Sequence, residues 1–92
     1  MELLSDDQVT AKLSELPGWE RDGDAIIRTS VRDDFRGALL YTGAVGYLAE
    51  AANHHPDITI QWNKVTLKLS THSAGGLTAA DFALATQITG LG

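Results

Sequence analysis

The 92-residue chain contains no cysteine, which removes disulfide bonds, thiolate catalysis and cysteine-based zinc sites from consideration. It has only seven lysines and arginines against twelve aspartates and glutamates, so the formal net charge is -5. The few basic residues are scattered along the chain, whereas a surface that binds a nucleic-acid duplex needs them clustered. We therefore expect no nucleic-acid partner.

Long hydrophobic runs are also missing. The most apolar stretch, residues 37–49, is too short to cross a bilayer and carries polar residues. The N-terminal segment is acidic and lacks the apolar core of a signal peptide. These features predict a cytoplasmic protein with no membrane partner, and the chain length predicts a single domain over residues 1–92.

Local signals in the first third of the chain predict a helix followed by a hairpin. Ser5 and Gln8 have the spacing of a capping box, and Pro17 ends the helix that this box begins. Asp22-Gly23 is a strong tight-turn signal between two segments of strand-like composition. An α-β-β order follows for this part of the chain.

The middle of the chain predicts a long helix. It begins at Asp33 or Asp34 and ends near Asn53 or His54, because Pro56 disfavours helical geometry in the residue before it. One broad apolar face of this helix is expected to lie in the core. The residues of that face are Leu40, Tyr41, Ala44, Val45, Leu48, Ala51 and Ala52.

Two glycines inside that helix, Gly43 and Gly46, each cost about 1 kcal/mol relative to alanine. They would suit close contact with a sheet or with another subunit. Residues 58–62 and 65–72 then alternate between apolar and polar, which predicts a second hairpin. Trp62 continues the apolar face of its strand and is expected in the core.

A third helix begins at Thr78, where Asp81 completes a second capping box. This capping role is the main one expected for Asp81. The element order is α-β-β-α-β-β-α, which is typical of an α+β fold with helices packed on one face of an antiparallel sheet. Trp19, beside the first hairpin, is expected to pack in the core.

All three histidines of the chain lie at the ends of two predicted segments. His54 and His55 precede the first strand of the second hairpin, and His72 ends the other strand. These two ends of a hairpin are adjacent, so the fold should bring the histidines together. Glu50 lies one helical turn before His54 and is predicted to orient its imidazole. The simpler interpretation is a solvated helix end and an unrelated exposed histidine.

Three converging histidines could also bind zinc. Adjacent histidines are a poor chelating pair, because histidine pairs that bind zinc from a helix are spaced i, i+4. We therefore expect no metal site. Histidines exchange protons near neutral pH, and acid–base handling of a small ligand is the function that this cluster favours.

The chain also resembles a known family. Its residues match, in order and spacing, the signature of the pterin-4a-carbinolamine dehydratases, and the resemblance covers essentially the whole chain. The matching pattern reads Glu50-x3-His54-His55-Pro56-x5-Trp62-x9-His72-x8-Asp81.

The resemblance implies three helices on one side of a four-stranded antiparallel sheet. It implies dehydration of a 4a-hydroxytetrahydropterin to the quinonoid dihydropterin, without a metal or organic cofactor. It makes His54, His55 and His72 the catalytic residues, with Glu50 supporting His54 and with Asp81 in a supporting position. The pterin contacts that it implies are His54, His55, Pro56, Thr71, His72, Ser73 and Ala74.

The same resemblance implies a homodimer or homotetramer, since a sheet with open edges has reason to pair. It also implies a functional link to an aromatic amino acid hydroxylase, whose pterin cofactor the reaction would recycle. Two other functions remain open at this point. One is a non-catalytic binding or regulatory module on the same fold, and the other is a small metal-binding protein.

Overall fold

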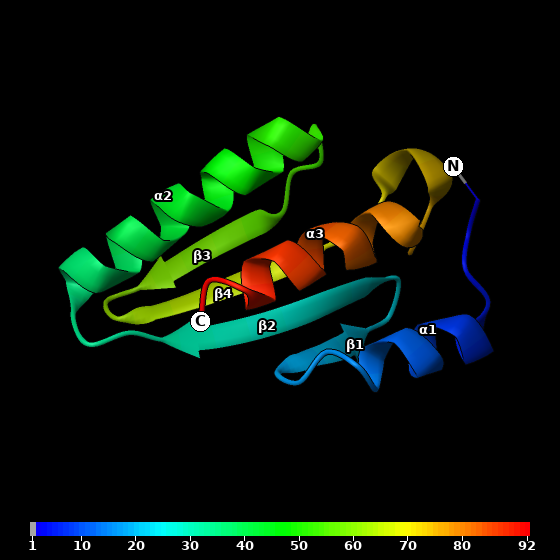
Figure 1. Ribbon diagram of the computed structural model, residues 1–92, viewed down its shortest axis with the longest axis horizontal. Helices are drawn as coiled ribbons and strands as arrows, with labels where there is room; N and C mark the ends of the chain where they lie inside the picture. The colour runs from blue at the N-terminus through cyan, green and yellow to red at the C-terminus, as the bar shows by residue number, and fades with distance from the viewer. Residues whose placement is uncertain (1) are drawn as a thin grey trace.

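The computed structural model describes residues 2–92 and shows a four-stranded antiparallel sheet with three helices on one face (Figure 1). The predicted fold class and element order are confirmed, with a short 3-10 helix, η1, added after the last strand. The elements are α1 (Asp6–Leu13), β1 (Trp19–Asp22), β2 (Ala25–Val31), α2 (Phe35–Ala52), β3 (Asp57–Gln61), β4 (Lys64–Leu69), η1 (His72–Ala74) and α3 (Ala79–Thr89).

The helices begin where the sequence predicts. Ser5 caps α1 in a capping box with Gln8, and Thr78 caps α3 in a capping box with Asp81. The carboxylate of Asp34 caps α2 by accepting a hydrogen bond from the backbone N–H of residue 37. Each cap satisfies a backbone N–H that has no partner inside its helix.

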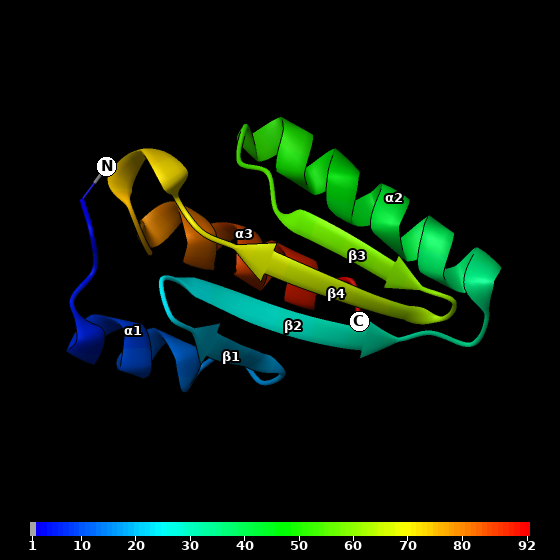
Figure 2. The ribbon, with the colours of Figure 1, turned by 180° about the vertical axis from the view of Figure 1, so that it is seen from behind.

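The strands lie in the order β1-β2-β4-β3, so β2 and β4 are central and β1 and β3 form the edges. The two hairpins therefore meet through β2 and β4, where Ile26 pairs with Leu69. Figure 2 shows the opposite face of the sheet, over which no helix within residues 2–92 packs. One end of this sheet carries the start of β3, the end of β4 and the β1–β2 turn.

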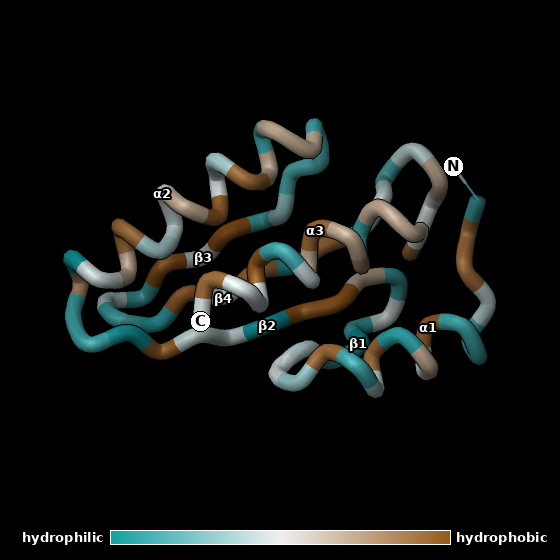
Figure 3. The backbone as a smooth tube through the Cα atoms, viewed as in Figure 1, coloured by the Kyte–Doolittle hydropathy of each residue, from teal (hydrophilic) through white to brown (hydrophobic). Residues whose placement is uncertain are grey.

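The core lies between the sheet and the helices, and Figure 3 shows apolar residues on both α3 and the central strands. Fully buried side chains include Ile26, Val45, Leu67 and Ile88. Trp19 is buried as predicted, and its indole N–H donates to the Thr89 hydroxyl at 2.9 Å. The N-terminal hairpin is thereby joined to the C-terminal end of α3.

Two predictions about buried aromatic and apolar residues are wrong. Trp62 is 69% exposed, because β3 ends at Gln61 and the tryptophan lies in the turn with a positive φ of 53°. Leu40 is exposed on α2, whose buried stripe is narrower than predicted, and Ala51 and Ala52 are exposed with it. The buried residues of α2 are Ala38, Tyr41, Val45 and Ala49.

The glycines of α2 do not contact the sheet. Beyond the local helix backbone, a Cβ atom built on Gly43 or Gly46 meets no atom within 4 Å, so the predicted close approach to a sheet is wrong. Contact with another subunit stays a prediction. None of the helices within residues 2–92 is long and apolar enough to cross a membrane.

Candidate active site

The C-terminal end of α2 positions the paired histidines. Asn53 follows the helix in a left-handed conformation, with φ 50° and ψ 43°. The backbone N–H of His54 then donates to the carbonyl of Ala49 at 3.0 Å, five residues back. Such a left-handed closure satisfies carbonyl groups at the helix end and turns the chain sharply. His54 therefore leaves the helical path with its backbone held in place.

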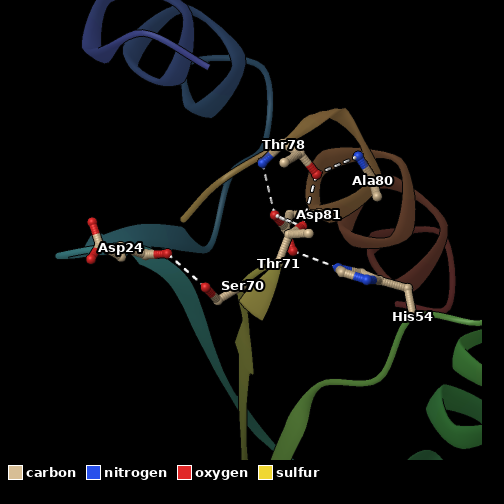
Figure 4. A network of polar contacts seen from close by, with 7 residues as sticks. All are labelled: Asp24, His54, Ser70, Thr71, Thr78, Ala80 and Asp81. Carbon is tan, nitrogen blue, oxygen red and sulfur yellow. Dashed lines mark hydrogen bonds and ion pairs between the residues drawn. The ribbon is translucent and has the colours of Figure 1, made fainter. Parts of the chain in front are cut away.

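The His54 ring contacts α3. Its Nε2 lies 2.5 Å from Oδ1 of Asp81, across 27 residues of sequence (Figure 4). The Asp81 side chain is fully buried, whereas 15% of the His54 side chain is exposed. A buried carboxylate thus fixes one nitrogen of a ring that still reaches the surface.

The predicted pairing of Glu50 with His54 is wrong. Glu50 instead contacts His55, with 2.7 Å between Oε1 and Nε2. Glu50 and His54, four residues apart, would be neighbours only if the helix continued through His54. The left-handed Asn53 ends the helix one residue before His54. Both side chains of the new pair are mostly exposed, at 79% for Glu50 and 58% for His55.

Asp81 has more than the predicted capping role. Its Oδ2 accepts hydrogen bonds from the backbone N–H of Thr78 at 2.9 Å and from the hydroxyl of Thr71 at 2.8 Å. Thr71 and Thr78 are themselves buried and joined by their hydroxyls at 2.8 Å. Spacing alone revealed the capping box, but it contained no signal for the contact with His54 or for the two threonines.

His72 lies on an exposed turn beside this network. It begins η1, just past the end of β4 as predicted. The carbonyl of Thr71 accepts the N–H groups of Ala74, Gly75 and residue 76, at 3.0, 3.0 and 3.3 Å, and Gly75 closes the turn with φ 78°. The turn therefore presents His72 from a fixed base, and Thr71 at that base links it to Asp81 and His54.

The other residues predicted to contact a substrate lie around the same end of the sheet. Pro56 is half-buried between the paired histidines and β3, and Ser73 and Ala74 lie on the η1 turn, exposed and half-buried respectively. Thr71 differs from them, because it is buried and its hydroxyl, N–H and carbonyl all have partners within the chain.

His72 also borders a hollow of about 340 Å³ on the face of the sheet away from the helices. The register puts these strand residues on that face, since Ile26 and Leu69 point into the core and their neighbours point away. Its lining includes three aspartates and one lysine. The lining residues are Asp22, Asp24, Ala25, Asp57, Lys68, Ser70, His72 and Gly75.

Within residues 2–92, no group of three or more histidine, aspartate or glutamate side chains is placed to hold a metal ion. Each histidine at the end of α2 instead contacts a single carboxylate, which suits the orientation of an imidazole for proton transfer.

A family model described as pterin 4 alpha carbinolamine dehydratase matches residues 2–91 of the chain. The chain belongs to this family. Its curated relatives are named after the same dehydratase, a hydro-lyase. One from Thermomicrobium roseum is 50% identical, with 99% of this chain and 98% of the relative covered. Another from Roseiflexus sp. is 53% identical, with 92% and 91% covered.

Solved structures agree with the fold. A crystal structure described as transcriptional coactivator/pterin dehydratase, from Brucella melitensis, matches with a TM-score of 0.93 at 28% identity, covering 98% of each chain. A pterin dehydratase-like protein described as a RuBisCO assembly factor in the alpha-carboxysome matches with a TM-score of 0.68 at 19% identity, covering 80% of this chain and 88% of that one. The second likeness is one of fold alone.

Proposed function

We propose that this protein dehydrates a 4a-hydroxytetrahydropterin to the quinonoid dihydropterin by histidine acid–base catalysis. Family membership supports the reaction. The observation that carries the mechanism is the pair of imidazoles at the end of α2, each held by its own carboxylate, beside the turn that presents His72. The catalytic residues in this proposal are His54, His55 and His72.

The proposed chemistry is an elimination of water. The bond from C4a to the hydroxyl oxygen breaks, an acid gives that oxygen a proton, and water departs. A base removes the proton from N5, and the electron pair left on nitrogen forms the double bond to C4a. Only protons are transferred and no electrons are exchanged with another molecule, so the step as written uses imidazoles alone.

The proposed substrate position lies between the paired histidines and the η1 turn. His54, His55 and Pro56 would contact the pterin from one side, and His72, Ser73 and Ala74 from the other. The hollow beside His72 is within the size range of small-molecule pockets. Its carboxylates suit the amino and N–H donors at the pyrimidine edge of a pterin.

In the cell, this activity would return the pterin to use after an aromatic amino acid hydroxylase has formed the 4a-hydroxy product. We place both in the cytoplasm. Neither a metal nor an organic cofactor is part of the proposed reaction.

We also propose that the protein assembles as a homodimer or homotetramer. The edge strands β1 and β3 have unpaired backbone groups that another sheet can meet. The outer face of α2 exposes Phe35, Leu39 and Tyr47 alongside its two glycines. A non-catalytic binding module is the second candidate function, and this same exposed apolar face is the observation that favours it.

Substitution of the histidines separates the two functions. We expect His54→Ala and His72→Ala to lower kcat for dehydration of a 4a-hydroxytetrahydropterin by roughly 10²–10⁴-fold, the usual contribution of a general acid or base. Decay of the 4a-hydroxy intermediate measures the rate, and circular dichroism checks that each variant keeps its fold. If both folded variants turn over as fast as the unsubstituted protein, the catalytic proposal fails and the binding module is preferred.

A further inference from the structure

A chain of hydrogen bonds runs behind His54 through three buried side chains. Thr78, Thr71 and Asp81 have almost no exposure to solvent, and each contacts the next (Figure 4). Thr71 is also a predicted pterin contact, but its hydroxyl, N–H and carbonyl all have partners within the chain. The hydrogen bonds of these three side chains can be assigned a direction, and that direction determines which nitrogen of His54 holds a proton.

The first hydrogen bond of the chain is the one between Thr78, at the start of α3, and Thr71. The Thr78 hydroxyl oxygen accepts the backbone N–H of Ala80 at 3.3 Å and the backbone N–H of Asp81 in the capping box. A hydroxyl has two acceptor lone pairs and one proton to donate. The single hydroxyl proton of Thr71 goes to Asp81, so the Thr71 oxygen is the acceptor in its 2.8 Å contact with the Thr78 hydroxyl.

Thr71 is the next donor in this chain, and Asp81 is its acceptor. Its hydroxyl donates to Oδ2 of Asp81 at 2.8 Å, where the backbone N–H of Thr78 also donates at 2.9 Å. An ionised carboxylate only accepts hydrogen bonds, so Oδ1 must accept one from His54. The proton in the 2.5 Å contact consequently belongs to Nε2 of the imidazole.

We propose that this chain fixes the tautomer of His54, with the permanent proton on Nε2, so that Nδ1 is the atom that exchanges a proton with the substrate. Thr78, Thr71 and Asp81 are then positioning residues. Neutral His54 has a lone pair on Nδ1 and acts as a base there, while protonated His54 donates from the same atom. The role of Nδ1 in proton exchange rests on the proposed function of His54, but the assignment of the ring proton to Nε2 does not.

Replacement of Asp81 by asparagine tests the direction of the chain. Thr71 and the Thr78 N–H both donate at the Oδ2 position, so the amide oxygen of Asn must lie there. Its NH₂ group then faces Nε2 of His54, which becomes an acceptor and moves the ring proton to Nδ1. The atom that serves the substrate is thereby blocked, because the tautomer is set by the partner of the other nitrogen.

The experiment is a long-range ¹H–¹⁵N NMR spectrum of the whole labelled protein, at a pH where His54 is neutral. We expect the Nε2–H tautomer in the unsubstituted protein and the Nδ1–H tautomer in Asp81→Asn. We also expect kcat to fall by roughly 10²-fold or more in this variant, as for loss of a general acid or base, with little change in KM. Thr86→Val is the matched control, since Thr86 lies on α3 and its hydroxyl donates to the Phe82 carbonyl at 2.8 Å, away from Asp81.

The outcomes separate the inference from the proposed function. An Nδ1–H tautomer in the unsubstituted protein overturns the inference, even if His54→Ala abolishes activity. A switched tautomer with unchanged kcat supports the assigned direction and overturns the role of Nδ1. If Asp81→Asn does not fold, Thr71→Val and Thr71→Ser replace it. Serine keeps the donor to Asp81 and should give a higher kcat than valine, whereas equal activity in both folded variants contradicts a positioning role for Thr71.

Discussion

Each histidine at the end of α2 contacts one carboxylate, but the two carboxylates lie in very different environments. Asp81 is fully buried, contacts His54, and accepts hydrogen bonds from the Thr71 hydroxyl and from the Thr78 N–H at the start of α3. Glu50 is exposed and contacts only His55 among the side-chain partners found within residues 2–92. Replacing them should therefore have unequal effects on stability.

We expect Asp81→Ala to lower the free energy of unfolding by about 2–4 kcal/mol, since it removes a cap and leaves buried donors unpaired. We expect Glu50→Ala to change it by less than about 1 kcal/mol, as for an exposed ion pair. Urea denaturation of the two variants measures both values. Similar losses in both would show that burial does not distinguish these carboxylates.

The sequence predicted the capping role of Asp81 but not its contact with His54. Capping depends on three-residue spacing, which is visible in the sequence, whereas the contact joins residues 27 apart through the packing of α3. Glu50 was assigned to the wrong histidine because the left-handed Asn53 changes the direction of the chain just before the pair. A single backbone conformation therefore decided which carboxylate each histidine meets.

Among the elements, α2 shows the largest departure from its expected environment. Its outer face has Gly43 and Gly46 with open space where a side chain would begin. Helix starts were predictable from capping residues, but the width of the buried stripe was not, and α1 ends at Leu13, before the predicted stop at Pro17. Leu40 is exposed because α2 packs over the edge of the sheet near β3, so that only one side of it is covered.

We expect Gly43→Ala and Gly46→Ala each to raise the free energy of unfolding by about 0.5–1 kcal/mol, because alanine restricts the unfolded chain and its Cβ meets no atom beyond the local helix backbone within 4 Å. Gly75→Ala is the contrasting control and should destabilise, since its φ of 78° is unfavourable for alanine. Thermal and urea unfolding provide the values. A loss of stability in the α2 variants would mean that another chain packs closely against these glycines.

For the whole molecule, exposed apolar area on α2 and two open sheet edges favour self-association. We expect sedimentation velocity to detect a dimer or tetramer. Leu39→Lys with Tyr47→Lys should shift it toward monomer by placing charge on the apolar face, while Thr29→Lys on the opposite sheet face should not. An unsubstituted protein that sediments as a monomer contradicts the proposed assembly.

The overall architecture was predictable because hairpin signals, helix caps and apolar periodicity all agree with one topology. The hollow beside His72 was not, because its residues come from all four strands or their ends and meet only when β2 pairs with β4. Trp62 was wrongly predicted to lie in the core, because the alternation of apolar and polar residues does not show where a strand ends.

The two tryptophans have consequences for spectroscopy. Trp19 is buried and bonded to Thr89 at the C-terminal end of α3, the same helix that begins beside Asp81. Trp62 is in solvent at the distant β3–β4 turn. In a Trp62→Phe background, indole emission would come from Trp19 alone. A change in that emission would therefore report whether α3 is packed on the sheet. Because Asp81 lies on α3, it would also report whether this carboxylate is in place beside His54.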